Sequence, residues 1–121
     1  MKAVVHLHST YCTALACLDK LDPEDVIKPF TPYVVMRMGK VGLVPYFKPG
    51  SEALCEAVAK MAPRHKAIIL ANHGPVVGGS DLTAAVNNAE ELEATAQLYF
   101  LLHKDVGPIR YLTASEIEEL L

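Results

Sequence analysis

The segment AIILANHG, residues 67–74, determines the fold class more than any other stretch of the chain. Its first five residues form an uninterrupted apolar run, which is typical of a strand buried on both faces. Asn72, His73 and Gly74 then end the run with residues that favour a turn. Helical patterns lie on both sides of this strand, so strands and helices alternate along the chain. The sequence therefore predicts an α/β or mixed α+β fold.

Apolar periodicity, caps and turn residues predict the elements around this strand. Helices are expected from Ser9 or Thr10 to near Leu21, from Ser51 with an apolar face of Leu54, Val58 and Met61, at 81–104 after a cap at Ser80, and at 113–121. Residues 22–25 are a helix-start signal, and the helix that they start is expected to be short because Pro29 and Pro32 follow. Further strands are expected at 3–8, 41–44 and 75–77, with 33–38 as a strand or turn. The strand at 3–8 is expected to be buried.

The composition limits the class of protein. The 121 residues carry a net charge of −3 and are 51% hydrophobic, with a mean hydropathy of +0.22. A chain of this length forms one domain at most. No basic stripe is present, so we expect no nucleic-acid partner. The high apolar content indicates that some apolar surface meets a partner, which predicts a homo-oligomer or a missing part of the same fold.

The expected location is the cytoplasm. No apolar run approaches the roughly 20 residues that cross a bilayer, so no membrane association is expected. The first residues lack the pattern of a signal peptide. Three cysteines, an odd number without a CxxC pair, are expected to be reduced and mostly buried thiols.

Three histidines form the strongest chemical signal. His6 and His8 are two residues apart in an expected strand, so their side chains point to the same face. His73 follows the buried strand at 67–71, where ligands often bind in α/β sheets. Three nitrogen ligands with an open position are typical of a catalytic metal site. The alternatives are hydrogen-bonded core histidines at 6 and 8 and a simple turn residue at 73.

Other titratable residues are weaker candidates. His65 is flanked by charged residues and is expected to be solvated, and His103 is expected near a helix C-terminus. Glu93 falls within the apolar arc of the longest helix, between Leu92 and Ala96. We expect this carboxylate to be largely buried and to form a structural hydrogen bond, in preference to a catalytic role.

Three segments together resemble the class II aldolase/adducin family. They are AVVHLHS at 3–9, LANHGP at 70–75 and AEELEATAQLY at 89–99. TPYVVM at 31–36 and LVPYFKPG at 43–50 make the chain most similar to the family's 3-oxo-tetronate 4-phosphate decarboxylases. The adducin branch has lost the metal ligands, whereas this chain keeps a histidine at all three positions.

The resemblance implies an α/β/α layered fold with a mostly antiparallel central sheet, assembled as a ring-shaped tetramer with active sites between subunits. Residues 1–121 would form the C-terminal part of the domain, with the N-terminal part missing. His6, His8 and His73 match the family's metal ligands, and the metal is usually Zn²⁺. Tyr33 lies where some members supply a catalytic acid from a neighbouring subunit. The phosphate-binding loops and an acid/base glutamate would precede Met1.

The activity implied is that of a metal-dependent carbon–carbon lyase acting on a sugar-acid phosphate. It would decarboxylate a 3-oxo-tetronate 4-phosphate through a metal-stabilised enediolate. A sugar-phosphate aldolase of the fuculose-phosphate type would use the same metal chemistry and remains an alternative. A second alternative is a non-catalytic fragment that only folds and oligomerises. Without the preceding part, we expect the isolated chain to have little or no activity.

Overall fold

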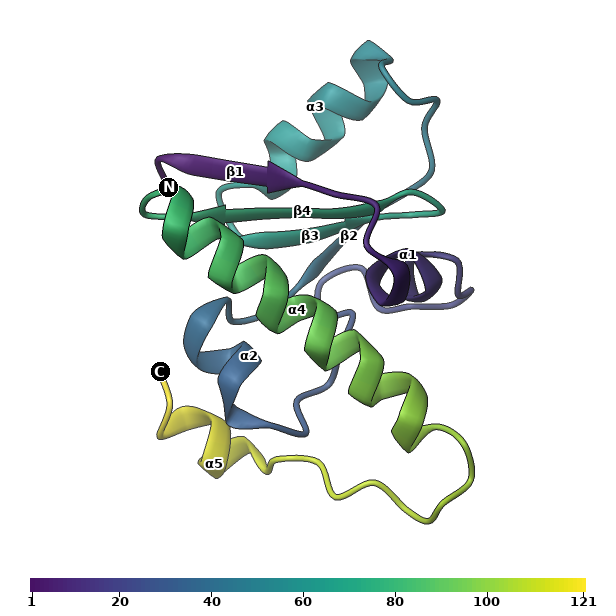
Figure 1. The fold of residues 1–121 in the computed structure, drawn as a ribbon, viewed down its shortest axis with the longest axis vertical. Helices are drawn as coiled ribbons and strands as arrows, with labels where there is room; N and C mark the ends of the chain where they lie inside the picture. The colour runs from purple at the N-terminus through teal and green to yellow at the C-terminus, as the bar shows by residue number, and fades with distance from the viewer.

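The computed structural model describes residues 1–121 and contains one four-stranded sheet between two layers of helices (Figure 1). The elements are β1 (Ala3–His6), α1 (Thr10–Ala16), α2 (Pro32–Arg37), β2 (Gly42–Val44), α3 (Glu52–Met61), β3 (Ala67–Leu70), β4 (Gly74–Gly79), α4 (Leu82–Leu102) and α5 (Ala114–Glu118). The strand order is β1-β4-β3-β2. β4 pairs antiparallel with both β1 and β3, and β2 runs parallel to β3. The expected α/β/α layers and mostly antiparallel sheet are confirmed.

Strand β3 lies at the centre of the packing, as its apolar run predicts. All four of its residues are buried. Because side chains alternate between the faces of a strand, Ala67 and Ile69 join the core formed with α1, α2 and α4. Ile68 and Leu70 face the opposite way and pack against α3. Figure 1 shows α3 alone on one side of the sheet and the other helices on the opposite side.

Strand β1 differs from its expectation in length and burial. It ends at His6, and its residues alternate between half-buried and exposed along the strand. The reason is its place at the end of the sheet, where it pairs only with β4. An edge strand has one unpaired side. Leu7 and His8 leave the strand and lead into α1, which ends at Ala16 and so is shorter than expected.

Two segments between α1 and β2 contradict the sequence-based expectations. Residues 22–25 form turns in place of the expected helix, because the backbone here bonds to the segment that contains β2. Leu43 N–H donates to Pro23 O, and Val26 N–H donates to Val41 O. A strand or turn was expected at 33–38, but residues 32–37 form helix α2. Proline at the first helical position starts this helix.

The other helices agree with the sequence to within a few residues. Helix α3 begins after Ser51, whose hydroxyl accepts from Leu54 N–H, as expected. Helix α4 is capped by Asp81, not by Ser80. Its buried face also differs from the expected arc, since Leu82 and Val86 are exposed. Helix α5 begins with the capping box predicted at residues 113–116. No helix has the length and apolar character needed to cross a membrane.

Two expectations about burial are wrong. His65 is buried, because its ring nitrogens bond to the Lys40 carbonyl at 3.0 Å and to the Glu24 carboxylate at 2.9 Å. The ring therefore bonds to protein groups, whereas its charged neighbours in the sequence had led us to expect bonds to water. Of the cysteines, which are all unpaired, Cys12 is buried while Cys17 and Cys55 are exposed. Cys17 lies just past the end of the shortened α1, where the chain turns to the surface.

Candidate metal centre

His6 occupies the last position of β1, opposite Val76 of β4. Its Nδ1 lies 2.9 Å from the carbonyl oxygen of Pro75. A carbonyl only accepts, so Nδ1 carries the hydrogen, and Nε2 of the neutral ring presents a lone pair. Metal-ligating histidines commonly have their second nitrogen held by a backbone carbonyl in this way.

His73 lies in the tight turn that joins β3 to β4. The turn connects the paired residues Leu70 and Gly74, and His73 N–H donates to Leu70 O at 3.0 Å. Asn72 adopts a left-handed conformation with a φ of 60°, which asparagine tolerates better than most residues. The turn residues noted in the sequence thus place an imidazole at the edge of the sheet where β1 ends.

Gly74 allows the chain beyond β1 to lie close to this turn. A Cβ at position 74 would stand 2.5 Å from the carbonyl oxygen of Leu7, and the φ of Gly74 is +155°. Leu7 also donates its N–H to Pro75 O at 3.3 Å. Because Leu7 lies between His6 and His8, this close approach brings both of those histidines to His73.

The three rings converge on one point through their Nε2 atoms. Nε2 of His73 lies 3.2 Å from Nε2 of His6 and 3.1 Å from Nε2 of His8. All three nitrogens lie within 4.8 Å of one another. Ligands about 2.0–2.1 Å from one tetrahedral ion stand about 3.3 Å apart. The donor set and its spacing therefore fit a divalent ion such as Zn²⁺, and the expected convergence is present.

The electrostatics of the cluster also favour a neutral imidazole at His73. Burial lowers the pKa of His73 from its ordinary value, and the neighbouring rings of His6 and His8 lower it further. A histidine must be neutral to donate a lone pair to a metal. His6 and His8 are exposed and His73 is half-buried, so the cluster is open to solvent on one side.

Helix α1 connects the segments that carry these histidines. It starts two residues after His8. At its other end, Ala16 O accepts from Asn72 N–H at 2.8 Å. Within the helix, the Thr13 hydroxyl lies 3.5 Å from the carbonyl oxygen of His73. This connection was not predicted from the sequence, in which the Asn-His-Gly turn is the one signal close to it.

Glu93 holds the N-terminus of α1. Its Oε2 accepts from Tyr11 N–H at 2.9 Å, and its Oε1 accepts from Cys12 N–H at 2.8 Å. The expected structural hydrogen bond is confirmed, with backbone amides as the donors. Glu93 is half-buried, less than the burial expected, because it lines an open groove between β1 and α4. Ser9, at the N-cap position, makes no side-chain cap bond.

The ionisation of Glu93 follows from these bonds. Burial alone favours its neutral form, but the amides of Tyr11 and Cys12 outweigh burial and lower the pKa of Glu93. Burial, reinforced by the negative charge of Glu93, raises the pKa of the Cys12 thiol to about 12. Near neutral pH, the carboxylate is therefore charged and the thiol is protonated.

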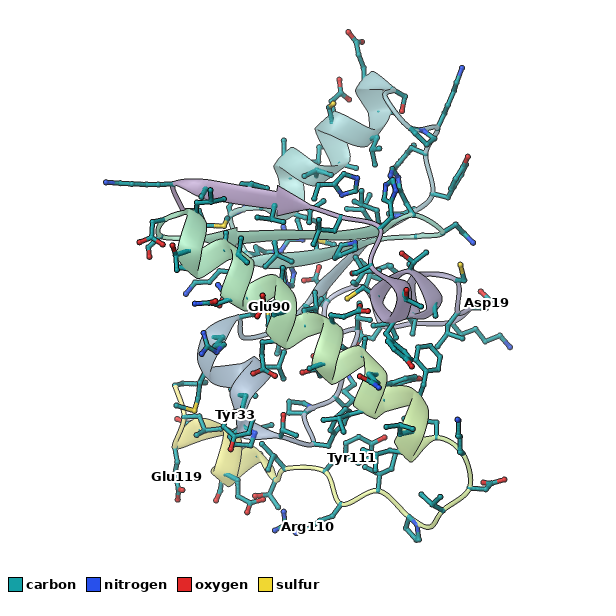
Figure 2. All side chains as sticks on the ribbon, viewed as in Figure 1. Asp19, Tyr33, Glu90, Arg110, Tyr111 and Glu119 are labelled. Carbon is teal, nitrogen blue, oxygen red and sulfur yellow. The ribbon has the colours of Figure 1, made fainter.

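Tyr33 lies apart from the histidines of its own chain. It is in the first turn of α2 and is 58% exposed, and Figure 2 labels it on this helix, away from the end of β1. The group of potential metal ligands consists of histidines only. The expected role of Tyr33 belongs to a neighbouring subunit's site, and it stays a prediction.

A groove of about 480 Å³ runs between β1 and α4. Apolar side chains of both elements line it, including Val5, Leu7, Val86 and Ala89. The groove lies at an edge of the sheet, because β1 is an edge strand. Part of the exposed apolar surface of the chain therefore lies along β1 and α4.

The chain is similar to a known protein family and to several curated proteins. The family model described as Class II Aldolase and Adducin N-terminal domain matches residues 1–100. A 3-oxo-tetronate 4-phosphate decarboxylase from Pectobacterium atrosepticum is 63% identical over 119 residues, which are 98% of this chain and 54% of the relative. An L-fuculose phosphate aldolase from Methanococcus maripaludis is 42% identical over 103 residues, 85% of this chain and 53% of the relative.

A solved structure agrees closely with the fold. The crystal structure of YgbL from Klebsiella pneumoniae superposes with a TM-score of 0.93 at 58% sequence identity. The match covers 98% of this chain and 56% of that one. The chain spans about half the length of the curated relatives it matches.

Proposed function

Because this chain belongs to the class II aldolase and adducin family, we propose that it forms the metal-binding part of a lyase that decarboxylates a 3-oxo-tetronate 4-phosphate. The observation that carries the proposal is the convergence of three imidazole Nε2 atoms at spacings of 3.1 and 3.2 Å. The 63% identity to a relative named for this activity supports the choice of substrate.

In this proposal, His6, His8 and His73 hold one divalent metal ion, and Zn²⁺ is the candidate. Three nitrogen ligands leave a position open for substrate. The bound ion would act as a Lewis acid toward the ketone oxygen of the substrate. The protein's own contribution is orientation, since the carbonyl of Pro75 fixes the tautomer and direction of the His6 ring.

We further propose that residues 1–121 correspond to the C-terminal part of the domain. The phosphate-binding loops and the acid/base glutamate would then belong to the part of the relatives that this chain does not match. Tyr33 is proposed to act as an acid in the site of a neighbouring subunit within a homo-oligomer, a tetramer by family resemblance. The exposure of Tyr33 and the apolar groove beside β1 support contacts of this kind. The unpaired cysteines support a location in the reducing cytoplasm.

The test compares two proteins loaded with Zn²⁺. One is the 121-residue chain, and the other is the same chain fused to the part of the Pectobacterium atrosepticum decarboxylase that it does not match. We expect the fusion to release carbon dioxide from a 3-oxo-tetronate 4-phosphate and the short chain to release little. The reason is that positioning and proton transfer each contribute a large share of the rate.

His73→Ala in the fusion is the matched control, because it removes one ligand and should abolish carbon dioxide release. Release that survives this substitution would contradict the metal role. A folded, metal-loaded fusion that cleaves L-fuculose 1-phosphate and releases no carbon dioxide would instead establish the aldolase alternative. The fusion would support the non-catalytic alternative if it acted on neither substrate.

A further inference from the structure

Helix α1 is a short link between the two parts of the histidine cluster. His8 leads directly into it, and its last residue, Ala16, accepts a hydrogen bond from Asn72 N–H, next to His73. The position of α1 along its own axis therefore affects His8 and His73 together. Any residue that determines this position also influences the spacing of the imidazoles.

Glu93 is such a residue. The first turn of a helix has free N–H groups, and the Glu93 carboxylate accepts from two of them, at Tyr11 and Cys12. Ser9 is the N-cap residue of α1, but its side chain forms no cap hydrogen bond with the first turn of the helix. Because a carboxylate near a helix N-terminus is stabilised by the backbone dipoles, the contact is favourable as well as specific.

The carboxylate itself is held by a rigid element. Glu93 belongs to α4, a helix of 21 residues. Its neighbours along the helix, Leu92, Thr95 and Ala96, are all buried to 1% exposure or less. A side chain fixed in this way can define where α1 begins, in contrast to an exposed carboxylate that moves with solvent.

We propose that Glu93 is a positioning residue for the metal site, acting through the first turn of α1 on His8 and His73. The inference rests on the proposed metal-binding function of the three histidines. Glu93 does not touch the metal point itself, since the potential ligand group contains histidines only. Residues that orient metal ligands from outside the ligand set typically change metal affinity by about 10- to 100-fold when substituted.

The decisive variant is Glu93→Gln. It preserves the size of the side chain but replaces one acceptor oxygen by an amide NH₂, so one of the two backbone amides loses its acceptor. Glu90→Gln is the matched control, because it makes the same charge change on the same helix at an exposed position (Figure 2). Zn²⁺ affinity of the 121-residue chain is measured by competition with a chromophoric chelator, and Co²⁺ absorption reports the ligand geometry.

We expect Glu93→Gln to weaken Zn²⁺ binding by about 10-fold or more and to change the Co²⁺ spectrum, with Glu90→Gln like the wild type. A folded Glu93→Gln chain with wild-type affinity and spectrum would overturn the proposal. If Glu93→Gln does not fold, Glu93→Asp is measured, since it keeps both oxygens and shortens their reach; unchanged affinity there is equally contradictory. Failure of the wild-type chain to bind Zn²⁺ would refute the metal site itself, which is a separate result.

Discussion

Gly74→Ala is expected to destabilise the chain and to separate the histidines at the same time. Two costs add at this position. The φ of +155° is one that alanine rarely adopts, and such strained conformations cost about 1–3 kcal/mol. The new Cβ would also lie 2.5 Å from Leu7 O, so the backbone of Leu7 must move.

The displacement of Leu7 is the cost that affects the histidine cluster. Movement of Leu7 weakens its hydrogen bond to Pro75 O, and a bond of this kind contributes about 0.5–1.5 kcal/mol. The expected total for Gly74→Ala is therefore about 1.5–4.5 kcal/mol in the free energy of unfolding. Because Leu7 lies between His6 and His8, Zn²⁺ affinity should fall as well.

Gly107→Ala is the control for the first cost. Gly107 also has a positive φ, of +139°, but a Cβ there would meet nothing within 4 Å. Urea unfolding, followed by circular dichroism, measures both variants, and Zn²⁺ titration measures the site. Equal stability losses for the two variants, with unchanged Zn²⁺ affinity, would refute the argument that Gly74 is required for the close approach of Leu7.

Three further predictions concern the site, the helix contact and the assembly. Zn²⁺ at about 100 times its dissociation constant should raise the free energy of unfolding by about 2.7 kcal/mol, and His73→Ala should remove this effect in a thermal unfolding experiment. Glu93→Ala should cost about 1–3 kcal/mol, because two amides lose their acceptor. The pKa of Glu93 is lowered below 4.5 in the folded chain. The stability difference between wild type and Glu93→Ala should therefore be complete above pH 4.5 and should disappear as the pH falls through the folded-state pKa. A stability difference that grows on acidification in urea titrations would contradict this pH dependence. Light scattering at high micromolar concentration should find an oligomer, and a monodisperse monomer would contradict it.

The sequence was sufficient wherever local signals and packing agree. The apolar run at 67–70 became the central strand, and the capping box at 113–116 begins α5 as expected. The segment at 33–38 is the opposite case, because it was expected as a strand or turn while Thr31 and Pro32 start a helix. Tertiary packing of Val34 and Val35 decides between them.

The site was predictable in part for the same reason. The spacing of His6 and His8 and the turn at His73 identified all three rings. The pattern could not show that Leu7 approaches Gly74, or that α1 joins the two segments, since these contacts cross more than 50 residues of sequence. The partners of Glu93 could not be predicted either. They are the backbone amides of Tyr11 and Cys12, and every residue except proline carries such an amide.

The edge position of β1 has a second consequence, which concerns how a bound ion would hold this strand in the sheet. His8 and His73 are 65 residues apart in sequence, so an ion bound by both closes a long loop, as a disulfide would. The chain-entropy estimate for a crosslink of this length is about 4 kcal/mol. Strand β1 pairs with β4 alone, so its backbone is hydrogen-bonded on one side only. Metal binding is therefore expected to slow the hydrogen exchange of the β1 backbone amides, because His6 is the last residue of that strand.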